Sequence, residues 1–268
     1  MTHRTAAPDK LLFLHLPKTA GSTIKSFLRA EVGDVFIQAN GAEQLERGDP
    51  LVGRVRDLDD IRRVLDAHRG LALHVDSTFD AVRRTVDFRS LAWYVFAPEH
   101  RACFTNIAIL TMFRHPYKRF LSEYSFVRRM KAADPGFLPD LDVDSAADFL
   151  HRSHPNAMLH FLLEPDLHRT RTMTRADLER VKARVRDHPI HVGIHERFDE
   201  SVGYFGRVLG REFHAREVPR LNAAPEAAPV LDPDLERIFA ERNPLDLELY
   251  DDAVKLFETR KPVRESGS

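Results

Sequence analysis

Short, nearly continuous apolar runs alternate along the chain with stretches in which apolar residues recur every three or four positions. The runs are typical of strands buried on both faces, and they lie at 11–16, 70–76, 107–113 and 189–194. Helical spacing predicts helices at 24–31, 57–69, 116–130, 145–152, 174–186, 198–209, 234–242 and 245–260. This alternation predicts an α/β fold, a three-layer sandwich around a mostly parallel sheet, with ligands at the carboxyl ends of the strands.

Two residues mark the starts of predicted helices. Pro116 suits the first helical position, and Thr174 is an expected N-cap. The segments 32–56, 76–105 and 131–172 are less regular, and we expect much of them to form loops. Within them, 134–154 is rich in proline and aspartate, and we expect a lid or substrate wall there.

The first apolar run leads into the small-residue loop Pro17-Lys-Thr-Ala-Gly-Ser-Thr23 and then into a helix start. The N–H groups at a helix mouth have no intrahelical partners, and the helix dipole is positive there, so this turn is suited to bind an oxyanion. Lys18 adds a cation, and Ser22 and Thr23 add hydroxyl donors. The loop is not a Walker A motif, because Lys18 precedes Gly21 instead of following the second glycine.

A second candidate site follows the run at 107–113, where 114–122 reads R-x-P-x-x-R-x-x-S. The guanidinium of Arg114 offers permanently charged, bidentate donors to a phosphate. Ser122 can approach the same phosphate only if the strand end folds against the helix that follows. Taken alone, the motif also fits an arginine that closes a strand and a surface serine. Two oxyanion sites at strand ends match a nucleotide with phosphates at both ends of its ribose.

These two segments resemble the 5′-phosphosulfate loop and the 3′-phosphate motif of sulfotransferases that use 3′-phosphoadenosine 5′-phosphosulfate (PAPS). The resemblance is to sulfotransferase family 2, the branch of carbohydrate 2-O-sulfotransferases and their bacterial relatives. It extends to 192–200, Leu221-Asn222 and 245–257. It implies a fold similar to P-loop NTPases and a co-substrate site formed by Lys18, Thr19, Ala20, Gly21, Ser22, Thr23, Arg114 and Ser122.

The chain departs from the family pattern at two positions of these motifs. Ala20 stands where many members have glycine, which restricts the loop backbone slightly. His115 stands where aspartate is commoner, and we expect the histidine to be able to cap the helix in its place. Neither change removes a predicted phosphate ligand.

The implied reaction moves SO₃ from PAPS to a hydroxyl, less often an amine, of a carbohydrate or glycolipid, and leaves adenosine 3′,5′-bisphosphate. Negative charge grows on the bridging oxygen as its bond to sulfur breaks, and Lys18 is the predicted cation that faces it. A base must take the acceptor proton, and His74 is predicted because family members carry a histidine after a similar strand. His15, beside the loop, is the main alternative; His115 and Glu123 are lesser ones.

Composition excludes several other classes of function. The 40 basic and 41 acidic residues give no overall field that would attract nucleic acid. The single cysteine, Cys103, excludes an internal disulfide. His151 and His154 have a spacing found in metal sites, but no further ligand pattern completes one, and the reaction requires no metal.

The chain is expected to form one domain over 1–268, with flexible ends at 1–9 and 261–268. No stretch of about eighteen apolar residues and no signal segment is apparent, so we expect a cytoplasmic, bacterial enzyme. Two alternatives stay open. A small-molecule kinase would need the missing GK[ST] lysine and a Walker B acid, whereas a catalytically silent nucleotide-binding module would keep both phosphate sites. The sequence leaves the acceptor and the oligomeric state open.

Overall fold

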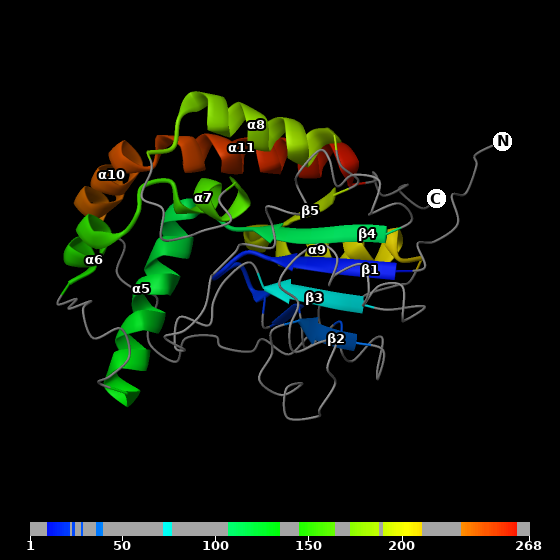
Figure 1. Cartoon of the computed structure of the whole chain (residues 1–268), viewed down its shortest axis with the longest axis horizontal. Coiled ribbons are helices and arrows are strands. Elements are labelled where there is room, and N and C mark those ends of the chain that lie inside the picture. Colours follow the sequence, from blue (N-terminus) through cyan, green and yellow to red (C-terminus); the bar gives the residue numbers. More distant parts are fainter. Residues whose placement is uncertain are drawn as a thin grey trace, which may run out of the picture.

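The structure is a computed structural model that describes residues 10–21, 23, 24, 28, 36–39, 72–76, 107–134, 145–163, 172–187, 190–210 and 232–261. Within these residues the strands are β1 (Lys10–His15), β2 (Phe36–Ala39), β3 (Ala72–Asp76), β4 (Ile107–Phe113) and β5 (Ile190–Ile194). They form one sheet in the order β2-β3-β1-β4-β5 (Figure 1), and every neighbouring pair is parallel.

Strand β1 lies at the centre of the sheet, between β3 and β4. Leu12, Phe13 and Leu14 are fully buried, which explains why this strand is apolar at successive positions instead of alternating. Thr111 is a buried polar residue of β4, and its hydroxyl donates to the Leu14 carbonyl oxygen at 2.9 Å. The carboxyl ends of β1, β3 and β4 therefore meet at one edge of the sheet.

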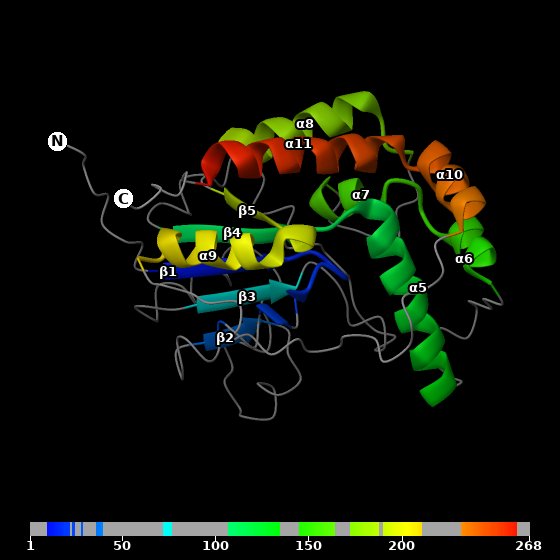
Figure 2. The same ribbon diagram turned by 180° about the vertical axis from the view of Figure 1, so that it is seen from behind.

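The helices cover the sheet and extend it on one side. They are α5 (Pro116–Ala133), α6 (Ala146–Arg152), α7 (Ala157–Leu163), α8 (Arg175–Asp187), α9 (Phe198–Val208), α10 (Pro233–Arg242) and α11 (Pro244–Arg260), with a short 3₁₀ turn at His195–Arg197. Helix α9 lies across one face of the sheet (Figure 2), and α8 and α11 run side by side next to β5. Helix α5 leads away from the end of β4 (Figure 1).

Two clusters of buried apolar side chains hold these elements. The larger one joins the sheet to α7, α8, α9 and α11. The second lies between α5, α6 and α10, where the Phe120 ring is 5.5 Å from the ring of Phe149 and 5.3 Å from that of Phe239. Helix α5 therefore packs against α6 and α10. Because α5 follows the end of β4, this second core lies next to the carboxyl edge of the sheet.

The structure confirms the α/β fold with a parallel sheet and the four predicted strands. Strand β2 and helix α7 fall in segments expected to be loops. The four residues of β2 are too few to show a period, and β2 forms by pairing with β3 at the sheet edge. Helix α7 reads Ala-Met-Leu-His-Phe-Leu-Leu and is buried almost throughout, so it has no polar face to mark a helical period. The helix predicted at 57–69 lies outside the described residues.

Both helix-start predictions are confirmed. Pro116 is the first residue of α5, which runs three residues beyond the predicted end at 130. Thr174 and Asp177 cap α8 reciprocally: the Asp177 N–H donates to Thr174 Oγ1 at 3.3 Å, and the Thr174 N–H donates to Asp177 Oδ2 at 2.9 Å. None of the helices in the described ranges is both long and apolar enough to span a bilayer.

Candidate active site

The loop after β1 opens a helix at the carboxyl edge of the sheet. The Thr19 hydroxyl donates to the Leu16 carbonyl oxygen at 2.8 Å and closes the turn. The Ile24 N–H donates to the Ala20 carbonyl oxygen at 3.0 Å. A helix therefore begins at the end of this loop, and a helix mouth of this kind is where an oxyanion binds.

Two residues of the loop have left-handed backbone conformations. Lys18 has a φ angle of 64° and Ala20 one of 71°. For a residue with a Cβ this conformation costs about 1–2 kcal/mol, so surrounding contacts must fix it. The alanine that departs from the family pattern thus occupies a position where glycine would be unstrained.

His15, the last residue of β1, lies directly against this loop. A Cβ on Gly21 would come within 1.7 Å of His15 Nε2, so glycine is required there unless the imidazole moves. The His15 ring is half-buried and stacks on Phe13 with 6.1 Å between ring centroids. In the sheet His15 is paired with Asp76 of β3. One of the two candidate bases therefore touches the predicted phosphate loop.

The other candidate base, His74, lies within β3. Its backbone is paired with Phe13 of β1 and Gln38 of β2, two residues before Asp76 ends the strand. The structure describes its backbone only. The predicted ligand Ser22 lies outside the described residues.

Lys18 points from the loop to α5. Its Nζ is 4.1 Å from the centroid of the Phe126 ring, a cation–π contact. Burial lowers the pKa of Lys18 to about 8, Glu123 opposes that shift, and nearby arginines add to it. The ammonium is therefore close to losing its proton at mildly alkaline pH, and a bound oxyanion would stabilise it.

Arg114 connects the two predicted oxyanion sites. Its Nη1 donates to the Lys18 carbonyl oxygen at 3.1 Å, across 96 positions of sequence. Its Nε is buried and has no hydrogen-bond partner among the described residues, so one charged donor is left for a ligand. Burial lowers the pKa of Arg114, and Glu196 opposes the shift.

Ser122 and Glu123 lie on α5, between Arg114 and Phe126 in sequence. Ser122 is half-buried, two helical turns beyond the end of β4. Glu123 accepts a hydrogen bond from Nη2 of Arg119 at 2.8 Å, in an ion pair along the helix. This carboxylate is the one that supports the charge of Lys18.

Glu196 was not predicted as a site residue, although it contacts the residue next to Arg114. Its Oε1 accepts the His115 N–H at 3.1 Å, and its Oε2 accepts the Tyr250 hydroxyl at 2.8 Å. Burial and Glu196 together raise the pKa of Tyr250. The sequence offered one indication of this contact. Glu196 is an acidic residue two positions after the end of β5, and β5 lies beside β4, the strand that leads to Arg114.

The expectation that His115 caps α5 is wrong. His115 occupies the N-cap position, but its side chain makes no capping hydrogen bond. Its ring instead lies edge-on to Tyr250, with 5.4 Å between ring centroids. The packing of α11 against this corner therefore holds the imidazole away from the helix amides.

Across the described ranges, no group of three or more histidine, cysteine, aspartate or glutamate side chains could hold a metal ion. Of the pair with metal-like spacing, the His154 ring lies 5.6 Å from that of His160.

Comparison with known proteins relates most of the chain to one class of enzyme. A family model described as "Sulfotransferase family" matches residues 2–251. Comparison with curated proteins finds no significant match. Among solved structures, the chain is similar to a sulfotransferase from Alicyclobacillus acidocaldarius, with a TM-score of 0.50 and 17% sequence identity. That likeness covers 95% of this chain and 97% of the other, and it shows a common fold.

Proposed function

The chain belongs to the sulfotransferase family, and from that premise we propose that it transfers a sulfuryl group from PAPS to a hydroxyl group of an acceptor. The observation that carries the choice of donor is the hydrogen bond from Arg114 to the Lys18 carbonyl. It joins two cationic sites at one edge of the sheet, as a nucleotide with a phosphosulfate on one side of the ribose and a phosphate on the other requires.

In this proposal the loop after β1 binds one end of the donor, and Arg114 with α5 binds the other end. Backbone amides from Thr19 to Thr23, with the hydroxyls of Ser22 and Thr23, would hold the 5′-phosphosulfate at the helix mouth. Arg114 and Ser122 would hold the 3′-phosphate, and the unpartnered Nε of Arg114 is a donor that fits this role. Lys18, at the crest of the loop, would lie beside the bridging oxygen.

In the chemical step the acceptor oxygen attacks sulfur in line with the leaving phosphate oxygen. A bond forms between sulfur and the acceptor oxygen, and the bond between sulfur and the bridging oxygen breaks. Lys18 stabilises the charge that remains on that oxygen in adenosine 3′,5′-bisphosphate. A histidine takes the proton of the acceptor hydroxyl, so the charge on the acceptor oxygen does not build up.

We assign this base to His74 and keep His15 as the alternative. His74 matches the family pattern, whereas His15 lies against Gly21 of the loop. Replacing each histidine with glutamine separates the two. The true base is the one whose loss lowers kcat about 10²–10⁴-fold while the Kd of the bisphosphate changes little.

The acceptor is proposed to be a carbohydrate or glycolipid, and this part rests on the resemblance to the carbohydrate branch of the family. The residues that choose an acceptor are expected in 32–56, 76–105 and 131–172, most of which lie outside the described residues. A panel of sugars, phenols and lipids with radiolabelled PAPS identifies the acceptor class by direct transfer.

Binding of adenosine 3′,5′-bisphosphate, compared with ATP plus magnesium, tests the donor assignment. The bisphosphate is expected to bind at least tenfold more tightly, and preference for ATP would support the kinase alternative instead. The Lys18→Ala variant is expected to lose about 10²–10³-fold in kcat with a much smaller change in bisphosphate affinity. Tight bisphosphate binding without transfer to any member of the panel would favour a silent nucleotide-binding module.

A further inference from the structure

One face of α5 lies toward the loop after β1. Arg119, Glu123 and Phe126 follow one another at spacings of four and three residues, so they share a face of this helix. Phe126 is half-buried, and the centroid of its ring lies 4.1 Å from Nζ of Lys18. Helix α5 therefore contacts the lysine of the loop through an aromatic ring.

The Phe126 ring is the direct electrostatic contact of the Lys18 ammonium. Among the described residues, no carboxylate lies within ion-pair distance of Nζ. A cation over the face of an aromatic ring is attracted by the negative potential of that face, and the attraction is stronger where water is excluded. Burial lowers the pKa of Lys18 to about 8, because the ammonium has lost part of its hydration. The ring replaces some of that lost hydration.

The charged groups around Lys18 act in opposite directions. One carboxylate raises the pKa of Lys18 and three guanidinium groups lower it, those of Glu123, Arg129, Arg114 and Arg119 respectively. The guanidinium carbon of Arg129 lies 5.8 Å from the centroid of the Phe126 ring, so this ring is near two cations. Repulsion between these cations favours a neutral Lys18 unless attractive contacts oppose it.

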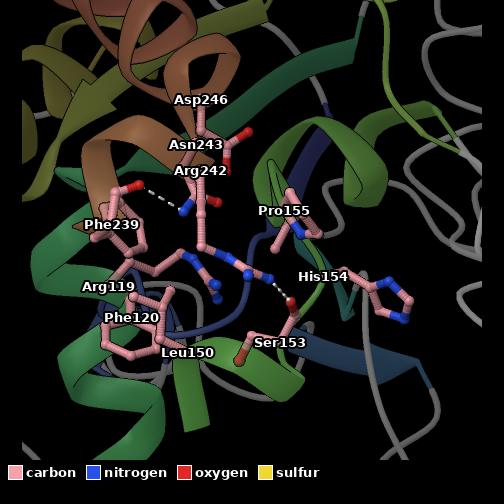
Figure 3. Close-up of a pocket in the computed structure, with 11 residues that line it drawn as sticks. Arg119, Phe120, Leu150, Ser153, His154, Pro155, Phe239, Arg242, Asn243 and Asp246 are labelled. Atoms are coloured by element: carbon pink, nitrogen blue, oxygen red, sulfur yellow. Dashed lines mark hydrogen bonds between the residues drawn. The ribbon is translucent and has the colours of Figure 1, made fainter. Parts of the chain in front are cut away.

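Glu123 is fixed from the second core. It pairs with Nη2 of Arg119 at 2.8 Å, and the Arg119 side chain is only 5% exposed. Figure 3 shows Arg119 beside Phe120 in a narrow space that Asp246 also lines. The volume of this space is about 10 Å³, roughly that of one water, so the guanidinium has little room to move. The packing of the second core therefore holds in place the carboxylate that supports Lys18.

We propose that Phe126 is a positioning residue for sulfuryl transfer, and that its ring holds the Lys18 ammonium in its charged form at the crest of the loop. This inference rests on the proposed function, in which the cation of Lys18 stabilises the charge on the bridging oxygen. A neutral amine at that position would not stabilise the leaving phosphate oxygen. Phe126 acts through Lys18, and the account requires no contact between the ring and the donor.

Phe126→Leu tests this role, because leucine keeps apolar bulk beside Lys18 and removes the aromatic face. The alkaline limit of kcat/KM is expected to move down by about 0.5–1 pH unit, since the cation–π contact favours the ammonium over the neutral amine. At pH 8 this shift lowers kcat/KM about two- to fivefold. The Kd of adenosine 3′,5′-bisphosphate at pH 6.5 should change less than about twofold. Phe126→Tyr, which keeps the aromatic face, should recover the wild-type limit.

Two further variants on α5 separate this role from a general change in the helix. Arg129→Gln removes a positive charge near the same ring, so it is expected to move the alkaline limit up. Tyr124→Leu removes a ring that contacts Arg128 instead, and it should leave the limit unchanged. An unchanged limit in Phe126→Leu, or an equal downward shift in Tyr124→Leu, would overturn the proposal.

Amine labelling measures the protonation of Lys18 without any turnover. The full chain is treated with acetic anhydride between about pH 6 and 10, and mass spectrometry follows acetylation of Lys18 against that of Lys255, whose side chain is 77% exposed. The midpoint for Lys18 is expected near pH 8 in wild type and lower in Phe126→Leu. If the wild type transfers no sulfuryl group, the proposed function fails, and a lower midpoint in Phe126→Leu still supports the hold of the ring on Lys18. Equal midpoints in the two proteins would overturn it.

Discussion

At the scale of single residues, the proposed site contains a lysine whose backbone conformation and burial are both energetically unfavourable. Lys18 combines a left-handed backbone, partial burial and a pKa lowered to about 8. Its side chain is satisfied by the face of Phe126, and its carbonyl by Arg114. A cation so poorly solvated interacts more strongly with a developing anion than an exposed lysine would.

The lowered pKa of Lys18 predicts an alkaline limit to activity. The role proposed for Lys18 requires its cationic form, so kcat/KM is expected to fall tenfold per pH unit above about pH 8. Lys18→Arg should keep the charge to much higher pH, at a lower maximum rate because the guanidinium has a different shape. A pH profile of both proteins checks this; an unchanged alkaline limit in the arginine variant would mean that another group titrates.

Glu196 is expected to position Arg114 for the 3′-phosphate. Glu196→Ala removes the acceptor of the His115 N–H, and we expect bisphosphate affinity to fall about tenfold, a loss of ~1.4 kcal/mol. Affinity for adenosine 5′-phosphate should change less than about twofold. Glu196→Gln, which retains an acceptor oxygen, should recover most of the loss. Calorimetric titration with both nucleotides measures the difference.

Glu200 offers a control for that comparison. It lies one helical turn on and pairs with Arg197 and Lys261 on the surface. Glu200→Gln should leave the ratio of the two nucleotide affinities unchanged. An equal effect of the Glu196 and Glu200 changes would point to a general loss of negative charge, not to positioning.

At the scale of elements, α7 and α11 cap each other. Asn156 Oδ1 accepts the amides of Leu245 and Asp246 at the start of α11, at 3.0 and 3.1 Å. In return, Asp246 accepts the amides of Met158 and Leu159 at the start of α7. Both helix starts are therefore satisfied by side chains about 90 positions away in sequence.

Burial raises the pKa of Asp246 from 3.8 to about 6, which predicts a pH dependence of stability. The folded state holds the proton more tightly than the unfolded state, so the contribution of this group to stability is greatest at low pH. It declines as pH rises from about 4 to 6, by up to ~3 kcal/mol. Urea unfolding of wild type and Asp246→Asn between pH 4 and 8 measures the change. A difference between the two that is constant with pH would contradict the assignment.

At the scale of the whole molecule, the sheet brings together segments that are far apart in the chain. The order β3-β1-β4 places the loop after β1 beside the strand end that carries Arg114. Helix α5 contacts Lys18 through the ring of Phe126 and packs in the second core. A nucleotide bound at the proposed donor site would contact both segments at once.

That arrangement predicts a specific pattern of hydrogen exchange. Adenosine 3′,5′-bisphosphate should slow amide exchange in both 16–24 and 114–126, because its two ends contact separate segments. Adenosine 5′-phosphate should protect chiefly 16–24. Exchange measured by mass spectrometry with each nucleotide checks this, and equal protection of 114–126 by both would contradict the role given to Arg114.

The sequence by itself determined the elements that carry a strong local signal. The apolar runs at 11–16 and 107–113 specify buried strands, and the small residues of 17–23 and Pro116 specify where helices begin. The family motifs lie in or directly after these segments, so Lys18, Arg114 and Ser122 could be predicted as ligands from the sequence. These motifs can be recognised from the sequence because the backbone geometry that they require spans only a few consecutive residues.

Only the tertiary structure decided which side chains meet across the sheet and between helices. The contact of Lys18 with Phe126 and the hydrogen bonds of Glu196 to His115 and Tyr250 each join elements that lie far apart in the sequence. Strand β2 and helix α7 likewise depend on partners, since one is short and the other is buried on all sides. Burial and charge at a site are properties of everything packed around it, and a local pattern of residues cannot contain them.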